Sequence, residues 1–198
     1  MSTAVMFSLI AAALTAVCSV PQFHRALRQT AGLSLSAWLQ SFALGLIWAG
    51  YGLATQQWVL LISEGAFACG SLAVVSRLLA WRRTAMCTVV CTLLVAGAFA
   101  VFGPGPCLVA ASLASVITRV AQIWGVLRSR TAAGVSILTW LVLATANFAW
   151  AAAGLCSSDN FFVWSAAIGG LASLAVIATC VGVGREPSSL EQTASGGA

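Results

Sequence analysis

The sequence has very little charge: it contains no lysine, four acidic residues, one histidine and nine arginines among 198 residues. Charged residues make up 7% of the chain, against about 25% in soluble proteins, and 61% of the residues are hydrophobic. So few charges cannot cover a folded chain of this size with a surface that water wets. The sequence therefore predicts an integral protein of the cell membrane.

The same scarcity argues against an enzyme. One histidine, His24, and one acidic residue inside an apolar segment, Glu64, are too few to assemble a catalytic constellation. The sequence contains no H-E-x-x-H motif, no nucleophile elbow and no phosphate-binding loop. Its seven cysteines form no C-x-x-C pair, so we interpret them as packing residues between helices. We expect no catalysis, no cofactor and no metal.

What the sequence does contain is a series of long apolar segments. The first runs to Phe23, and we interpret it as a retained helix because it lacks the basic start and the cleavage site of a signal peptide. A helix needs about 20 apolar residues to span the bilayer core. Seven segments have about this length: the first one and then 35–54, 57–80, 85–103, 106–127, 135–155 and 161–183.

The connections between these segments alternate in charge. Arginines follow the first, third, fifth and seventh segments, and the other connections contain none. Because basic residues flank spans on the cytoplasmic side, the N-terminus is predicted outside and the C-terminus in the cytoplasm. The positive charge thus indicates topology rather than a nucleic-acid partner. The arginines on the predicted cytoplasmic side are Arg25, Arg28, Arg77, Arg82, Arg83, Arg128, Arg130 and Arg185.

Pro21 and Gln22 stand at the end of the first apolar segment. Proline removes a backbone donor and opens the helix near residue i−4, and in lipid the freed groups must find other partners. A tolerated kink would by itself explain the proline. However, the stretch returns one hundred residues later, as Ala121-Gln122.

This return belongs to an internal repeat. Each copy, 4–80 and 106–183, has three predicted helices, and the segment 85–103 lies between the copies as a linker helix. Because one extra span restores the orientation, we expect an all-α fold of two parallel three-helix bundles in a 3+1+3 arrangement. With offsets of 100 and then 102 residues, the matches are Gln22 with Gln122, Arg28 with Arg128, Gly32 with Gly134, Ser34 with Ser136, Trp38 with Trp140 and Trp48 with Trp150.

The repeat, the Pro-Gln dipeptide and the stretch Trp48-Ala49-Gly50-Tyr51-Gly52 resemble the PQ-loop family, which includes the SWEET and SemiSWEET-like membrane proteins. The resemblance covers about residues 4–183. It implies a central site between the bundles, where one tryptophan and one asparagine of each bundle clamp the substrate. The tryptophans match Trp48 and Trp150, but the asparagine positions hold Glu64 and Ala166, which argues against a plain sugar carrier.

Two charged residues lie well inside apolar segments, Glu64 and Arg119. Such a charge costs at least ~2.5–3.5 kcal/mol in a membrane, so it faces the interior of the helix bundle. The two either form a structural ion pair, or Glu64 carries a proton or binds a cation. Asn147 precedes Trp150 by three residues on the same helical face, where its amide could bind a ligand or another helix.

The tryptophans permit two interpretations. Trp48 and Trp150 either hold the solute or belong to the aromatic belt at the membrane surface. We assign Trp38, Trp58 and Trp140, which lie nearer the segment ends, to that belt. The polar tail, 184–198, is expected to be disordered in the cytoplasm.

Together these features predict a membrane transporter that moves a small polar solute, a sugar or an amino acid, by alternating access. The alternative is a non-transporting binding protein on the same fold, such as a sorting receptor. The predicted partners are the solute, the lipid bilayer and protons, and the chain is either a monomer or a homo-oligomer. The expected binding residues are Trp48, Glu64, Asn147 and Trp150, with Glu64 and Arg119 as a coupling site or ion pair and Pro21, Gln22 and Gln122 as a hinge.

Overall fold

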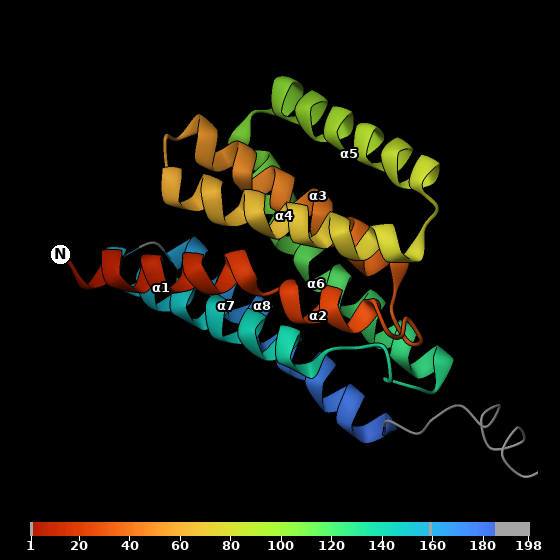
Figure 1. The fold of residues 1–198 in the computed structure, drawn as a ribbon. Coiled ribbons are helices and arrows are strands. Elements are labelled where there is room, and N and C mark those ends of the chain that lie inside the picture. The colour runs from red at the N-terminus through yellow and green to blue at the C-terminus, as the bar shows by residue number, and fades with distance from the viewer. Residues whose placement is uncertain (1, 159, 185–198) are drawn as a thin grey trace, which may run out of the picture.

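The computed structural model describes residues 2–158 and 160–184, and every regular element in these ranges is a helix. Six apolar segments are long enough to cross a membrane, so the chain is a multi-pass membrane protein. Figure 1 shows their arrangement. The six are the first segment, made of α1 (Thr3–Val17) and α2 (Val20–Ala26), and then α4 (Trp58–Leu78), α5 (Trp81–Phe102), α6 (Pro104–Ser129), α7 (Ile137–Ser157) and α8 (Asn160–Val183).

The seven predicted spans are thus confirmed for six segments. The remaining one, α3 (Leu35–Ala54), has the length of a span but lower hydropathy than the others. Residues such as Trp38, Gln40 and Ser41 lower it, and Trp38 and Ser41 are buried against other helices. A helix enclosed by protein needs less apolar surface than one that faces lipid.

The first segment is broken where Pro21 requires it. Helix α1 ends at Val17, four residues before the proline, and α2 begins at Val20. Proline has no N–H to donate to the carbonyl of residue i−4, and its ring clashes there, so the helix cannot continue. In the second copy Ala121 replaces the proline, and α6 runs without interruption.

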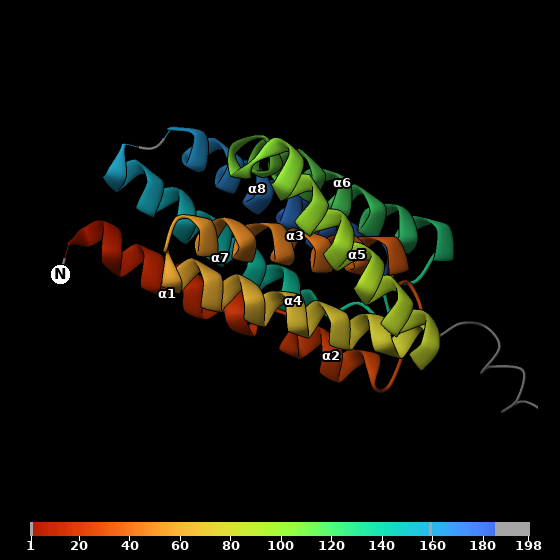
Figure 2. The same ribbon diagram turned by 90° about the horizontal axis from the view of Figure 1, so that it is seen from above.

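Six helical segments form a ring. Helix α1 packs against α4 and α7, α3 packs against α4 and α6, and α8 packs against α6 and α7. Helix α5 lies outside this ring, against α3, α4 and α6, and Figure 2 shows it from above, lying over α3. No residue of its apolar stretch is buried, which leaves that stretch to face lipid.

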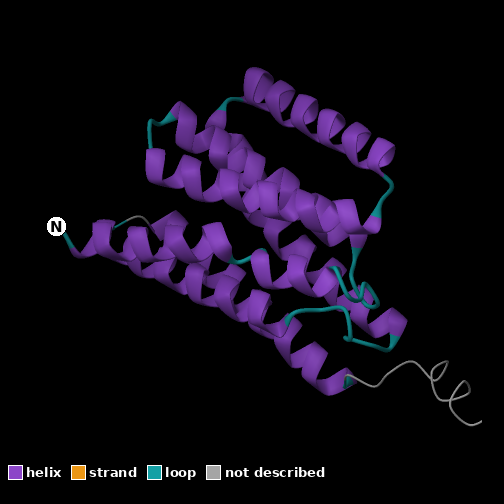
Figure 3. Ribbon diagram, in the orientation of Figure 1, coloured by secondary structure: helices purple, strands orange, loops and turns teal. Residues whose placement is uncertain are grey.

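The connections gather at the two ends of the helices (Figure 3). The loops 27–34, 79–80 and 130–136 and the end of α8 lie at one end, and the N-terminus lies at the opposite end (Figure 1). Most of the arginines outside α6 belong to these loops or to the adjacent helix ends. We call this the arginine end.

Two helices begin a few residues before the segments predicted for them. The linker helix begins at Trp81 rather than at 85, so Arg82 and Arg83 belong to its first turn. Helix α6 begins at Pro104 rather than at 106, since proline is well tolerated in a first turn, where its missing N–H needs no partner. The predicted tail lies outside the described residues from 185 onward.

The assignment of Trp38 and Trp140 to the membrane surface was also wrong. Each is 3% exposed, and their ring centroids lie 6.4 Å apart with the planes inclined by 58°. The two occupy matching places near the start of α3 and α7, so both point to the line where the two copies meet. The position of a residue near a helix end indicates how deep it lies in the membrane, but not whether its side chain points to lipid or into the protein. Trp58, by contrast, is 59% exposed, as a surface anchor would be.

Candidate functional site

A cavity of about 80 Å³ lies inside the ring. A single water needs about 10–15 Å³ of such space, so the cavity has room for a small solute. Each helix of the ring (α1, α3, α4, α6, α7 and α8) contributes lining residues. The five residues predicted for binding or coupling all line it: Trp48, Glu64, Arg119, Asn147 and Trp150.

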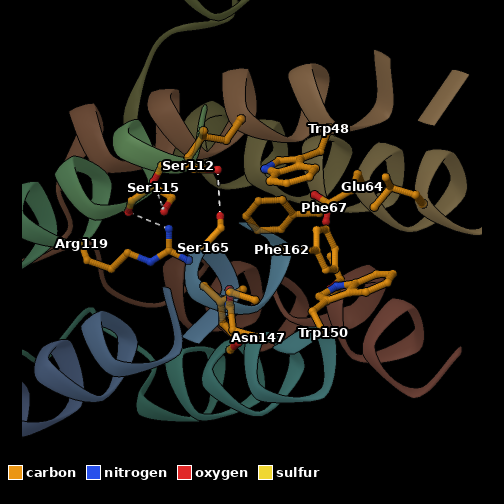
Figure 4. A pocket seen from close by; sticks show the side chains of 15 residues that line it. Trp48, Glu64, Phe67, Ser112, Ser115, Arg119, Asn147, Trp150, Phe162 and Ser165 are labelled. Atoms are coloured by element: carbon orange, nitrogen blue, oxygen red, sulfur yellow. Dashed lines mark hydrogen bonds between the residues drawn. The ribbon is translucent and has the colours of Figure 1, made fainter. Parts of the chain in front are cut away.

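Aromatic rings form one side of the cavity (Figure 4). Trp48 and Trp150 both contact Phe162, with ring centroids 5.9 Å and 5.5 Å apart and nearly perpendicular planes. This edge-to-face arrangement is a favoured geometry for aromatic pairs. The indole N–H of Trp150 also donates to the Thr15 hydroxyl at 3.3 Å. The repeat-related tryptophans therefore converge on one phenylalanine.

Phe162 was missed in the sequence. It lies in a segment that is apolar throughout, where one more aromatic residue carries no signal. At the 102-residue offset its partner is Leu60, which also lines the cavity. The repeat could have shown that the two positions are equivalent, but not that they face the cavity.

Polar groups lie on the opposite side of the cavity from the tryptophans (Figure 4). Arg119 is 7% exposed; its Nη1 donates to the Ser115 carbonyl at 2.7 Å, and its Nε lies 3.5 Å from the Ser173 hydroxyl. The Ser165 hydroxyl donates to that of Ser112 at 2.8 Å. A signal for this side existed, since Ser112, Ser115 and Arg119 lie three and four residues apart and share a helical face.

Glu64 lies on the aromatic side, next to Phe67 and the tryptophans (Figure 4). It is 9% exposed, and its carboxylate makes no hydrogen bond or ion pair with any residue that the structure describes. The ion pair with Arg119, one of the two sequence interpretations, is therefore not formed within the described part of the chain. Both oxygens of Glu64 are thus without a hydrogen-bond partner among the described residues, and its predicted role in binding stays a prediction.

Asn147 is partly occupied by its own helix. Its side-chain nitrogen donates to the Leu143 carbonyl at 2.7 Å. Its oxygen packs against Gly169 of α8, where any larger residue would place a Cβ about 2.6 Å from it. The amide thus keeps capacity for a ligand, but α7 and α8 hold it in place.

Gln22 lies outside the cavity, at the arginine end. Its amide nitrogen donates to the Gly134 carbonyl at 2.8 Å, and its oxygen accepts from the Ser136 N–H at 2.8 Å. The nearby Arg25 donates from Nε to the Ala133 carbonyl at 2.6 Å. Gln22 is fully buried and so attaches the first copy to the loop before α7.

Gln122 makes the matching contacts in the other direction. Its nitrogen donates to the Gly32 carbonyl at 2.9 Å, and its oxygen accepts from the Ser34 N–H at 3.3 Å. The two loops cross closely, and a Cβ at Gly32, whose φ is 79°, would collide with the Thr131 carbonyl. The glutamines are thus reciprocal cross-links between the copies, and the hinge role that the resemblance implies for them stays a prediction.

No model of a known protein family matches this chain, and no curated protein matches it in sequence. The likeness to PQ-loop proteins therefore rests on the repeat and on the residues named above.

Proposed function

We propose that this chain is a transporter that moves a small polar solute across the membrane by alternating access. The proposal rests on the cavity inside the ring. On one side of this cavity the repeat-related Trp48 and Trp150 converge. A concave space lined by aromatic and polar groups is typical of small-molecule sites, which also lie between the repeats of many transporters.

We extend this proposal to the architecture: residues 4–80 and 106–183 are two parallel three-helix bundles, with α5 as the linker. The helix contacts support it, because α4 packs against α1 and α3 in the same way as α8 packs against α6 and α7. The reciprocal bonds of Gln22 and Gln122 support it too, since matching residues make them in both copies. Equivalent contacts of this kind are expected from two parallel repeats.

The proposed transport cycle requires the contacts between the cavity and the arginine end to open. Toward the arginine end, Trp38 and Trp140 contact each other, and the glutamine cross-links lie beyond them along α3 and α7. To release a solute at this end, the contact between the two tryptophans and the glutamine cross-links must both separate. The break between α1 and α2 supplies a place where the first bundle can bend, and Glu64 is the residue that would couple the cycle to protons.

We further propose that the arginine end faces the cytoplasm, with the N-terminus outside. A reporter fused after Gly197 should then be active inside the cell. In a variant without the native cysteines, Gln56→Cys should react with an impermeant reagent from outside, and Arg83→Cys should not. External labelling of Arg83→Cys would contradict this orientation.

Counterflow in liposomes tests the function directly. Purified protein is reconstituted into vesicles preloaded with one unlabelled sugar or amino acid, and uptake of the same labelled solute is followed. We expect uptake above that of protein-free vesicles for at least one solute. If a solute raises the melting temperature of the protein but no solute shows counterflow, the binding-protein alternative is supported instead. If every solute fails in both measurements, both functions are contradicted.

A further inference from the structure

We infer that the solute is a small zwitterion, whose carboxylate binds Arg119 and whose ammonium group binds Glu64. The inference rests on the proposed function only in taking the cavity as the place where a solute binds.

The cavity is lined by one acidic and one basic residue. Glu64 and Arg119 line the same cavity, each about nine-tenths buried, yet no ion pair joins them in the described structure. Buried charges are costly unless each has a partner of opposite sign. A sugar would partner neither charge, and a purely cationic or anionic solute would partner only one. A zwitterion partners both.

Arg119 has N–H donors that no described residue uses. A guanidinium group has five N–H bonds in a planar fork that suits a carboxylate. Here Nε and Nη1 contact Ser173 and Ser115, and Nη2 donates to no described residue. The hydroxyls of Ser112 and Ser165 lie on the same side of the cavity (Figure 4). This side therefore has N–H and O–H groups for an anionic solute group.

Figure 4 places Glu64 among Trp48, Phe67 and Trp150, away from Arg119. Aromatic faces attract ammonium groups, and the free carboxylate supplies the opposite charge. The two ends of the cavity are thus suited to the two ends of one zwitterion.

The repeat places the two charges in different copies. At the matching positions, the partner of Glu64 is Ala166 and the partner of Arg119 is Ser19. Each charge therefore occurs once, with the acid in the first copy and the base in the second. A site of this kind distinguishes one end of its solute from the other, as a head-to-tail zwitterion requires.

The first experiment uses wild-type protein in liposomes, with neutral L-amino acids and D-glucose as probes. We expect counterflow of at least one amino acid and none of glucose. For that amino acid, two competitors separate the charges: its amide keeps only the ammonium group, and its α-hydroxy acid keeps only the carboxylate. Each should compete roughly 10- to 100-fold more weakly, because each loses one charge-assisted contact.

The second experiment uses mutation to change which of the three compounds, the amino acid, its amide or its α-hydroxy acid, the protein prefers. Arg119→Gln should favour the amide over the amino acid, and Glu64→Gln should favour the α-hydroxy acid. Arg83→Gln, in the first turn of α5, is the matched control and should keep the wild-type order. Melting curves report whether each variant folds. If Arg119→Gln does not, Arg119→Lys keeps the charge without the fork and should bind the amino acid more weakly in the same order.

The outcomes separate this inference from the proposed function. Counterflow of glucose as fast as that of any amino acid, or equal competition by the amino acid and both analogues, overturns the zwitterion and leaves transport intact. Failure of every amino acid to bind or exchange overturns it as well. Binding of amino acids with the expected order, but without counterflow, supports the zwitterion and overturns transport.

Discussion

At the arginine end, the glutamines of the two copies of the repeat make equivalent contacts with the opposite copy. Gln22 bonds the loop before α7, and Gln122 bonds the loop before α3, through the same atoms and at matching residues. The loops close on each other so tightly that both need glycine, at 32 and 134. Here each of the two glutamines has a counterpart across the interface, so a change in one copy alone would leave polar groups of the other unpaired.

At the cavity, the same two copies differ. Glu64 stands opposite Ala166 in the alignment, and Arg119 opposite Ser19. The break at Pro21 is likewise present only in the first copy. The reciprocal contacts thus hold the two copies together. The cavity can carry different residues in the two copies, because a solute need not be symmetric.

The largest expected effect concerns the aromatic pair that the copies share. Trp48→Ala and Trp150→Ala should each abolish uptake, because the aromatic side of the cavity loses one of its two tryptophans. Aromatic contacts contribute about 0.5–1.5 kcal/mol beyond area burial. Counterflow with protein levels matched by immunoblot measures this. Trp58→Ala, at an exposed position, is the control and should transport normally. Normal uptake by either cavity variant would return that tryptophan to the aromatic belt.

The next largest effect concerns the cross-links. Gln22→Ala and Gln122→Ala should each lower the free energy of unfolding by about 2–4 kcal/mol, because each leaves one carbonyl and one N–H of the facing loop without the partner that the glutamine supplies. Denaturation in detergent measures the loss, with Gln29→Ala, an exposed glutamine of the same loop region, as control. Since the contacts are reciprocal, the two losses should be similar. A large loss in one variant alone would show that the copies are held unequally.

A smaller effect concerns Glu64, where the copies differ. A proton and a solute ammonium group compete for one carboxylate, so counterflow at equal pH on both sides should fall several-fold between about pH 8 and pH 5. Glu64→Gln should remove this dependence, and Glu64→Asn should move the site toward the amide-lined site of the sugar carriers that the sequence resembles. Uptake that is flat with pH, together with normal transport by Glu64→Gln, would make the carboxyl structural and favour a sugar.

The smallest effect on stability concerns the break. Pro21→Ala makes the first copy resemble the second and allows the helix to continue, so the free energy of unfolding should change by about 1 kcal/mol or less. If bending at this place opens the cavity, the counterflow rate should nevertheless fall. Val20→Ala, beside the proline and exposed, is the control. An unchanged rate would remove Pro21 from the proposed hinge.

Much of the fold could be predicted because its causes are local. The low charge requires lipid, the length of each apolar segment fits the bilayer, and Pro21 breaks the helix four residues earlier whatever surrounds it. The repeat could be read by alignment alone. Glu64 and Arg119 could be placed inside the bundle because a charge cannot face lipid cheaply.

Other features depend on contacts between residues about a hundred positions apart. A helix that is apolar on all sides does not show which face turns inward. The direction of Trp38, Trp140 and Phe162 was therefore decided by packing, as were the bonds from Gln22 to a loop 112 and 114 residues away. The separation of Glu64 from Arg119 was decided in the same way. The sequence by itself determined that the charged side chains of Glu64 and Arg119 avoid lipid, because a charge there is costly. The tertiary structure decided what these two side chains meet inside the protein, and which of the uncharged residues join them.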